Sequence, residues 1–599
     1  MSQLQVRPLP GWATRAFRAF APLAPWRSCQ RRAVLAGVGL MALGSFPLLA
    51  QIQGVEGGAL ASDALRQAQE REDQRRSQLL PQPDGRLSRP LSVPAMSRLP
   101  TGETPCFPIE AVELALASPA PLPLRSVLAA LSGPEGDDPP QGKCLGARGA
   151  ALLVERAQNA LIEQGFITTR VFAGPQDLST GRLALQVVPG RIGAIRQDGK
   201  GARATLANAL PMGPGDLLNL RDVEQALENL RRVPTVQADI RLEPSAQPGH
   251  SDLVVRWEQD LPWRLLLTAD DSADKASGRY QGSVTVSHDH ALALNDLMYV
   301  TYSHDLGGGD PGPRGTRGVN AHYSVPLGDW LFSANASRNR YHQTVVGATQ
   351  DYVYSGESEQ RDIELRRLFH RDADSKSHGV FSLFSRRSRN HIDDTEVEVQ
   401  RRRVGGYQLG VEHRTQWGST EVDASVHFKR GTGAFGATVA PEDGFGEGTH
   451  RFALWGAALQ WRQPWVLGAQ RWQYQGQWRW QHNRTSLTPQ DRFAIGGRHT
   501  VRGFDGRASL SGDRGWLVRN ELSTPGDRGL RLYAALDHGR VGGPSSLQLV
   551  GTRLTGLALG ARASLDRVTC DVFLGWPLGK PAPFQTARVT YGVALSAGY

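Results

Sequence analysis

The sequence predicts α+β domains followed by a transmembrane antiparallel β-barrel of about 16 strands. Helical periodicity is confined to the chain before residue 262, and the 338 residues 262–599 show frequent apolar–polar alternation instead. The only sustained apolar run is residues 33–50, which excludes a membrane protein built of several helices. A membrane strand takes about 9–11 residues, and about as many again for turns gives about 16 strands around an aqueous channel.

Residues 1–50 have the features of a signal peptide. They contain six arginines and no acidic residue, and Arg31-Arg32 precedes the apolar run. Cleavage is expected after Ala50 or Ala61. The alternatives are an inner-membrane anchor helix and twin-arginine export of a folded chain. Without the six leader arginines the formal charge falls from +10 to +4, so charge is poor evidence for nucleic-acid binding.

Residues 63–80 form a short, highly charged helical pattern, and residues 81–105 form a proline-rich linker. Six prolines keep this linker extended. The helix therefore has no core of its own and must either dock on another surface or stay mobile.

Two units of similar plan follow, residues 106–189 and 190–260, and we interpret them as an internal repeat of small α+β domains. Asn219 is the expected N-cap of the last helix. The expected elements are an extended stretch over 109–116, a helix over 147–164 and strands over 167–172 and 182–188 in the first unit, and strands over 192–196, 236–242 and 253–257 with helices over 202–210 and 220–233 in the second.

Four cysteines are present, and the first, Cys29, leaves with the leader. Cys106 and Cys144 flank one segment and are the natural disulfide pair in an oxidising compartment; two unpaired buried thiols are the alternative. In the chain-entropy model, a disulfide that closes that loop stabilises the folded state by about 3–4.7 kcal/mol. Cys570 is interpreted as a small apolar residue on an outward face.

The sequence indicates neither a metal site nor an enzyme. It has no Cys-x-x-Cys pair, no Gly-x-Ser-x-Gly elbow and no phosphate-binding loop. His288-Asp289-His290 is the nearest metal-like cluster, and we interpret it as a solvated turn because further ligands are lacking. No cofactor is expected.

Alternation is clean in three segments of the predicted barrel, residues 397–414, 421–429 and 472–481. In the last of these, four aromatic residues oppose glutamines and an arginine. Charged polar faces opposite apolar faces that carry Trp and Tyr are typical of a barrel with lipid outside and water inside. A large soluble all-β domain is the alternative.

Several motifs resemble those of one family. Residues 487–522, LTPQDRFAIGGRHTVRGFDGRASLSGDRGWLVRNEL, contain Val501-Arg502-Gly503-Phe504, and the strand motif Leu536-Asp537-His538-Gly539-Arg540-Val541 follows. DVFLGWPLGKP at 571–581 lies near the end. Cys106-Phe107-Pro108-Ile109, Cys144, GFITTRV at 165–171 and GRLALQVVPGRIGAI at 181–195 resemble a first POTRA domain and its junction with a second. In this order the motifs resemble those of two-partner secretion transporters of the TpsB type.

The resemblance implies an outer-membrane barrel of a Gram-negative bacterium with two periplasmic POTRA domains. These would recognise an unfolded TpsA-type exoprotein of the haemagglutinin, haemolysin or contact-dependent toxin class, which is secreted through the pore. It also implies that the motif loop folds into the lumen, where Arg502 meets Asp537. Gly496, Gly497 and Gly503 would supply its tight turns. Other expected partners are outer-membrane lipid and the barrel-assembly machinery; we expect a monomer and no nucleic acid.

The residue pattern supports a lumenal Asp537 independently. Along the strand from Leu530, Asp537 shares parity with Tyr533 and Ala535, opposite Leu532 and Leu536. A carboxylate in a confined lumen favours an arginine partner. The alternative is that Arg502 is a solvated loop charge. Alternative functions are a barrel-assembly factor and a passive channel, and helix 63–80 is expected either in the pore or in the periplasm.

Overall fold

The computed structural model describes residues 66–77, 79, 98–198, 206–347, 349–468, 470–526 and 529–599. The predicted signal peptide, residues 1–50, and residues 81–97 of the predicted linker lie outside these ranges. Of the predicted helix 63–80, residues 66–77 and 79 are described, and all of them are helical. None of the described helices is long and apolar enough to cross a membrane.

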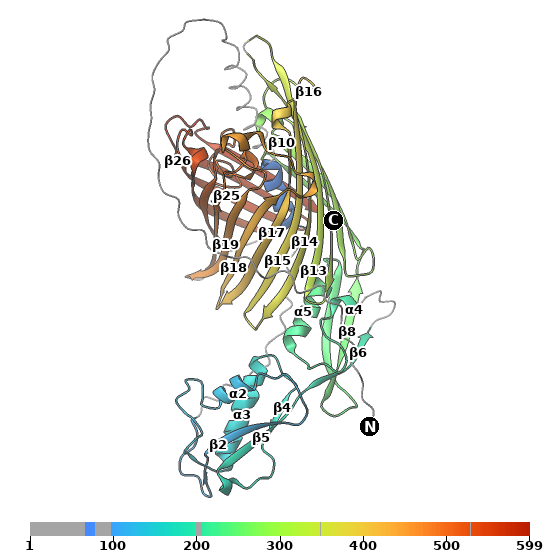
Figure 1. Ribbon diagram of the computed structural model, residues 1–599, viewed down its shortest axis with the longest axis vertical. Coiled ribbons are helices and arrows are strands. Elements are labelled where there is room, and N and C mark those ends of the chain that lie inside the picture. Colours follow the sequence, from blue (N-terminus) through green and yellow to red (C-terminus); the bar gives the residue numbers. More distant parts are fainter. Residues whose placement is uncertain are drawn as a thin grey trace, which may run out of the picture. The chain divides into compact units, whose positions relative to one another are not determined.

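The first α+β domain is a three-stranded sheet covered by two helices (Figure 1). Strand β5 (Arg182–Val188) lies between β2 (Ala111–Leu116), to which it is parallel, and β4 (Arg170–Phe172), to which it is antiparallel. Helix α3 (Ala147–Glu163) has the predicted position, whereas α2 (Leu124–Ala130) was not predicted. With seven residues after Pro123, α2 is too short to show helical periodicity.

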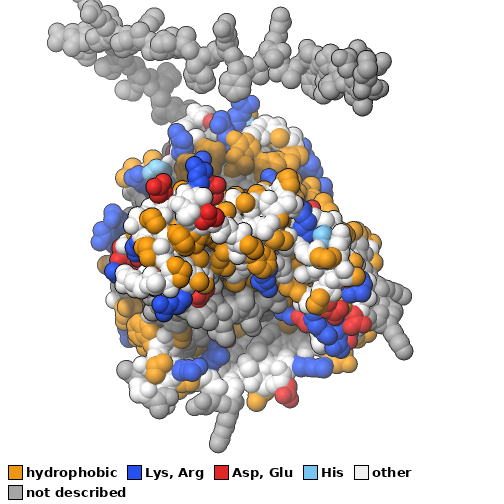
Figure 2. Space-filling view, turned by 90° about the horizontal axis from the view of Figure 1, so that it is seen from below, with side chains coloured by type: hydrophobic (Ala, Val, Ile, Leu, Met, Phe, Trp, Pro, Cys, Tyr) orange, Lys and Arg blue, Asp and Glu red, His pale blue; other side chains and the backbone are white. Residues whose placement is uncertain are grey.

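The helices close an apolar core against one face of the sheet. Leu153 and Leu161 of α3, Val127 of α2 and Leu185 of β5 are all buried in one cluster. Leu99 belongs to the same cluster, so the ordered domain begins before the predicted boundary at residue 106. On the face of the molecule seen from below, apolar side chains are interspersed with basic and acidic ones (Figure 2).

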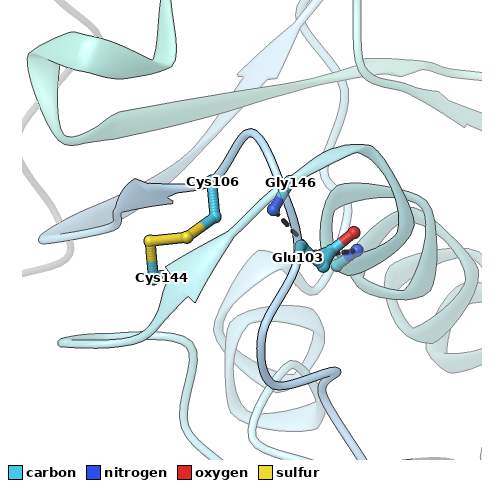
Figure 3. Close-up of a disulfide and its surroundings, with 5 residues drawn as sticks. Glu103, Cys106, Cys144 and Gly146 are labelled. Carbon is cyan, nitrogen blue, oxygen red and sulfur yellow. Dashed lines mark hydrogen bonds between the residues drawn. A yellow bond between two sulfur atoms is a disulfide. The ribbon is translucent and has the colours of Figure 1, made fainter.

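Helix α3 begins at a buried carboxylate (Figure 3). The Glu103 carboxylate accepts hydrogen bonds from the backbone N–H groups of Gly146, Arg148 and Gly149 at 2.8, 2.9 and 3.0 Å. Burial raises the pKa of this carboxyl, but the three N–H donors outweigh burial and hold the pKa below its ordinary value. Beside it, the Cys106–Cys144 disulfide joins β1 (Phe107–Pro108) to β3 (Cys144–Leu145).

A buried ion pair holds the loop before α3 against the helix. The Asp138 carboxylate accepts hydrogen bonds from the Arg156 guanidinium at 2.6 Å and from the backbone N–H of Leu99 at 2.8 Å. It also contacts the Lys143 ammonium. Burial raises the pKa of Asp138, but these donors lower it to about 2 overall.

The second domain repeats the topology of the first, in the strand order β6-β8-β7. Strand β8 (His250–Gln259) lies between β6 (Arg191–Asp198), to which it is parallel, and β7 (Val236–Pro244). Asn219 caps α5 (Leu220–Arg231): its side chain accepts a hydrogen bond from the N–H of Arg221 at 2.8 Å. Of the predicted helix 202–210, residues 206–209 are helical, as α4 (Leu206–Ala209), and residues 199–205 are not described.

The rest of the chain closes into an antiparallel barrel of sixteen strands, which confirms the predicted fold class (Figure 1). Closure is made by β27 pairing with β9, for example Ala597 with Leu267. The strands are β9 (Trp263–Asp270), β10 (Tyr280–Asp289), β11 (Leu297–Gly307), β12 (Gly315–Leu327), β13 (Trp330–Val345), β14 (Tyr352–Arg371), β15 (Ser375–Ile392), β17 (Arg402–Trp417), β18 (Thr420–Thr432), β19 (Ala453–Leu467), β20 (Gln470–Asn483), β23 (Arg514–Ser523), β24 (Leu530–Gly542), β25 (Arg553–Leu565), β26 (Val568–Gly579) and β27 (Thr590–Gly598).

The prediction of one alternating segment over 397–414 was wrong. Residues 398–400 form a 3₁₀ turn, and β17 begins only at Arg402. The turn is held by Gln400, whose side-chain oxygen accepts hydrogen bonds from the Tyr354 hydroxyl at 2.5 Å and the Asn390 amide at 3.0 Å. Gln400 therefore points inward to pair with polar groups, and the local pattern only resembles a strand.

The interpretation of His288-Asp289-His290 as a solvated turn was also wrong. Asp289 is fully buried and accepts hydrogen bonds from the Arg264 guanidinium at 2.9 and 3.0 Å. It also accepts one from the backbone N–H of Thr235 at 3.2 Å. Because Thr235 belongs to the second α+β domain, this barrel turn is covered by that domain. Among the described residues no cluster of metal ligands is found.

We predict an acid-sensitive contribution of Asp138 to domain stability. Its folded-state pKa of about 2 lies below the ordinary value of 3.8, so the stabilisation is complete above about pH 4 and is lost as the pH falls toward 2. The expected loss is about 2 kcal/mol. Urea unfolding of a fragment spanning residues 98–260 measures it as a function of pH.

The matched variants are Asp138→Asn and Asp137→Asn, since Asp137 is exposed and pairs with the exposed Arg98. Asp138→Asn should be less stable at pH 7 and lack this acid transition. Asp137→Asn should behave like the parent. Equal acid sensitivity of parent and Asp138→Asn would disprove the assignment.

Candidate functional site in the barrel lumen

The loop between β20 and β23 folds back into the barrel. It contains a short hairpin, β21 (Phe493–Ile495) and β22 (Leu510–Gly512), at whose end lie residues 496–509. The hairpin and loop bury apolar side chains against the inner wall of β23, β24 and β25. The cluster contains Phe493, Ile495, Val501, Phe504 and Leu510 of the loop, Leu517, Val541 and Leu554 of the strands, and Phe584.

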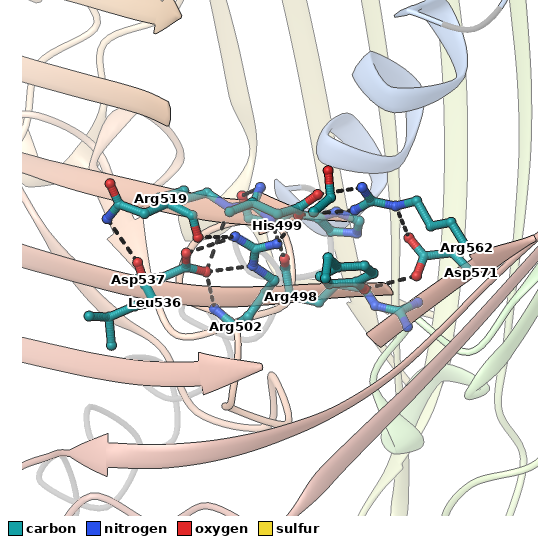
Figure 4. A network of polar contacts seen from close by, with 12 residues as sticks. Arg498, His499, Arg502, Arg519, Leu536, Asp537, Arg562 and Asp571 are labelled. Carbon is teal, nitrogen blue, oxygen red and sulfur yellow. Dashed lines mark hydrogen bonds and ion pairs between the residues drawn. The ribbon is translucent and has the colours of Figure 1, made fainter. Parts of the chain in front are cut away.

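Arg502, at the inner end of this loop, binds Asp537 on β24 (Figure 4). The guanidinium donates two hydrogen bonds to the two carboxylate oxygens, from Nε at 2.8 Å and from Nη2 at 2.9 Å. The backbone N–H of Arg502 donates a third, at 2.9 Å. Arg502 is 6% exposed and Asp537 is 0% exposed. The contact is thus a buried bidentate ion pair, the strongest geometry for this pair of groups.

A second carboxylate, Glu521 on β23, was not singled out from the sequence. Arg502 Nη1 donates to Glu521 at 2.6 Å, so one guanidinium joins two strands and two acids. Arg562 on β25 also contacts Glu521 and reaches Asp571 at 2.9 Å. Tyr533 completes the network through its hydroxyl, 2.8 Å from Asp571. Parity along β23 would have indicated that Glu521 faces inward, but which cation it meets depends on the folded loop.

Three glycines on neighbouring strands make room for the loop, two of them for its backbone and Gly539 for its side chains. A Cβ atom at Gly556 of β25 would lie 1.7 Å from the carbonyl oxygen of Arg502, and one at Gly575 of β26 would lie 2.9 Å from Cα of Gly503. A Cβ atom at Gly539 of β24 would meet Ile495 and Val501 at 2.9 and 3.2 Å. The loop therefore rests directly on strand backbone. Of the three, only Gly539 was expected from the sequence motif.

The predicted turn glycines lie where the loop changes direction. Gly496 has φ of 131° and Gly503 has φ of 101°, both in the region that favours glycine. The N–H groups of Gly496 and Gly497 both donate to the Thr500 hydroxyl at 3.1 Å, which closes the turn. Phe504 packs edge-on against Phe584, with ring centroids 5.8 Å apart.

The helix over residues 66–77 also lies inside the barrel, beside this loop (Figures 1 and 4). Arg66 donates to the carbonyl oxygen of Pro489 at 3.1 Å, in the loop segment before β21. Gln69 donates to Gln360 of β14 at 2.9 Å, on another part of the wall. Loop and helix together occupy the lumen. The helix contacts the wall through polar groups and also through Leu79, which is buried against Leu297 and Tyr299 of β11.

The chain matches known proteins over most of its length. The family model described as haemolysin secretion/activation protein ShlB/FhaC/HecB matches residues 249–563, and two POTRA models match residues 137–190 (ShlB-type) and 191–244. The outer membrane transporter CdiB-2 of Burkholderia pseudomallei is 36% identical over 550 residues, 89% of this chain and 93% of that protein. The hemolysin transporter protein ShlB of Serratia marcescens is 26% identical over 544 residues, 88% of this chain and 92% of that protein.

Solved structures agree with these matches. The structure of CdiB from Acinetobacter baumannii has a TM-score of 0.74 at 28% identity and covers 93% of this chain and 100% of its own. CdiB from Escherichia coli has a TM-score of 0.77 at 23% identity, with 90% and 99% covered, which supports the fold.

We predict that Gly556→Ala displaces the lumen loop without opening the barrel. The added methyl would overlap the Arg502 carbonyl oxygen, which is backbone and has no rotamer to change. Trypsin cleavage after Arg498, Arg502 or Arg507 in the detergent-solubilised protein should therefore become faster than in the parent.

Gly598→Ala on β27 is the matched control, since a Cβ atom there meets nothing within 4 Å. It should be cleaved at the parental rate. If Gly556→Ala is cleaved no faster than the control, close packing at Gly556 is not what seats the loop.

Proposed function

Because this chain belongs to the ShlB/FhaC/HecB family of haemolysin secretion/activation proteins, we propose that its lumen loop and N-terminal helix form the resting plug of a two-partner secretion pore. The family resemblance noted in the sequence is confirmed. The protein is an outer-membrane translocator, with its barrel in the outer membrane and its POTRA domains in the periplasm. The plug proposal depends above all on the bidentate Arg502–Asp537 pair inside the lumen.

We infer that the cargo is a secreted TpsA-type exoprotein, a class of haemagglutinins, haemolysins and contact-dependent toxins. Two of the matched relatives, from Proteus mirabilis and Serratia marcescens, are named hemolysin transporters. The named relatives are transporters, and no catalytic step or cofactor enters the proposed mechanism. We propose that the chain acts as a monomer inserted by the barrel-assembly machinery.

Capture of the exoprotein is proposed to begin on the two POTRA domains. Each sheet has two edge strands, β2 and β4 in the first domain and β6 and β7 in the second. An unfolded segment is able to add to such an edge through main-chain hydrogen bonds, which need no particular sequence. The face in Figure 2 exposes apolar side chains among basic and acidic ones, which suits a polypeptide that still exposes apolar side chains.

Opening then requires the plug to leave the lumen. Separating a buried ion pair costs about 3–5 kcal/mol when one partner is left unpaired, so the loop stays closed at rest. An entering chain with its own polar groups would replace these contacts and lower that cost. With no nucleotide in the periplasm, we propose that folding of the exoprotein outside the cell drives the transfer.

We predict that Arg502→Ala and Asp537→Asn each reduce exoprotein secretion strongly, and that the double variant is little worse than either. Either change leaves a buried charge without its partner, so the loop is expected to take up a misplaced position in the lumen that an entering chain cannot displace in the normal way. Because both changes break the same pair, their effects are not additive. Secretion is measured as exoprotein in the culture supernatant, with the amounts of transporter and of other barrel proteins measured in the outer membrane.

Arg507→Ala is the control, because Arg507 is 53% exposed and its ion pair with Asp310 spans 3.5 Å. It should secrete like the parent. Secretion at the parental level by both Arg502→Ala and Asp537→Asn would contradict the proposal. General loss of other barrel proteins would indicate an assembly factor instead.

A fragment spanning residues 98–260 should bind the N-terminal region of the exoprotein. This fragment keeps Leu99 in the core and Glu103 at the start of α3. Isothermal calorimetry or surface plasmon resonance measures the affinity, with the C-terminal region of the same exoprotein as control. If the fragment binds both regions equally, or binds neither, the POTRA domains do not recognise the N-terminal region specifically.

A further inference from the structure

The outward face of the barrel changes abruptly from apolar to basic on five neighbouring strands, β12 to β15 and β17. On β14 the outward residues Leu365 and Ile363 are exposed and apolar, and the next outward residue is Arg361. On β15 the same change occurs between Leu383 and Arg387. Beyond this change from apolar to basic residues lie seven outward arginines, which we call the outer arginine patch: Arg317, Arg338, Arg340, Arg361, Arg387, Arg389 and Arg403.

The patch lies at the end of the strands away from the POTRA domains. The opposite ends of β12 and β14 contact the second POTRA domain, where Asn229 donates to the Gly328 carbonyl at 2.8 Å and Arg371 binds Glu228 at 2.9 Å. Because the POTRA domains are periplasmic, the patch faces the outer leaflet and the cell exterior.

Strand register brings the arginines together. In one row, Arg317 pairs with Arg340, Arg340 with Glu357 and Glu357 with Arg389. In the next, Arg338 pairs with Glu359, Glu359 with Arg387 and Arg387 with Arg403. Six arginines against two glutamates leave four positive charges in excess over these two rows, and Arg361 adds a fifth from the next row.

The two glutamates are already used within the patch. Arg340 binds Glu357 at 3.0 Å, and Arg361 lies 3.7 Å from Glu359. Arg317, Arg387, Arg389 and Arg403 make no ion pair with any residue that the structure describes. Two cross-strand pairs, Arg317–Arg340 and Arg387–Arg403, set like charges directly opposite each other, which destabilises a sheet unless an anion lies between them.

We propose that the outer arginine patch binds the phosphorylated head group of an outer-leaflet glycolipid, whose acyl chains lie on the apolar residues below. Arginine binds phosphate with two parallel hydrogen bonds and is less strongly hydrated than lysine. The arginines point away from the lumen, so a chain in transit does not meet them. Tyr302, outward on the neighbouring strand β11, and Tyr407, outward on β17, are of the residue type that marks the head-group level.

The test uses the full-length protein in dodecyl maltoside and diphosphoryl lipid A as the probe. Native mass spectrometry measures the bound fraction as the lipid concentration rises. The variant Arg317→Gln/Arg387→Gln/Arg389→Gln removes three arginines without leaving a glutamate unpaired. Its lipid A affinity should fall by about tenfold or more, because three of the seven arginines that are proposed to bind phosphate are removed.

The matched control, Arg148→Gln/Arg182→Gln/Arg256→Gln, removes the same charge from exposed POTRA positions. It should bind lipid A within about twofold of the parent, since charge removed far from the lipid acts weakly. The heat-dependent shift of folded barrels on electrophoresis checks that each variant is folded. If the triple variant does not fold, the single variant Arg389→Gln is used in its place.

Three results would overturn the proposal. The first is equal affinity of patch variant and parent for diphosphoryl lipid A. The second is that the parent protein binds dephosphorylated lipid A, or inorganic phosphate, as tightly as it binds diphosphoryl lipid A. The phosphorylated lipid would then not be the recognised ligand. The third is that the patch variant binds lipid A like the parent but secretes less exoprotein. The patch would then bind the exoprotein rather than the lipid.

Discussion

The Arg502–Asp537 pair is the bidentate charged contact that joins the lumen loop to the barrel wall. A barrel of sixteen strands encloses more space than its own side chains fill, so something else must occupy it. Here a loop enters from one side, and its arginine neutralises a carboxylate that is fully buried on the wall. Without this cation Asp537 would be an unpaired charge away from water, which is costly. Loop position and wall charge therefore require each other.

Close approach of backbones makes that pair possible. Arg502 reaches Asp537 with both its side chain and its own N–H, so the loop main chain must lie almost on the strands. Gly556 and Gly575 allow this, because any larger residue would meet the loop backbone at 2.9 Å or less. The surface that receives the loop is thus complementary to it in shape as well as in charge, whereas the helix contacts the wall at separate points, some polar and one apolar.

The second POTRA domain is held to the barrel by a different set of charges. Glu228 on α5 binds Arg371 at 2.9 Å and Lys376 at 3.0 Å, both from the β14–β15 hairpin. Burial raises the pKa of Glu228, but the two cations outweigh burial and keep the pKa below its ordinary value. Asp289 anchors a second turn to the same domain. The second POTRA domain is therefore fixed to the periplasmic end of the barrel wall.

The sequence by itself determined the features that depend on short periods and short motifs. Alternation alone put Asp537 on the inner face, helical periodicity located α3 and α5, and the ordered motifs indicated the family. The tertiary structure decided which groups meet: Glu521 and Gly556 became part of the site, Asp289 proved buried, and residues 398–400 proved to be a turn. The physical reason is that a side chain's face is set by its neighbours along the chain, whereas its partner is set by strand register and loop path.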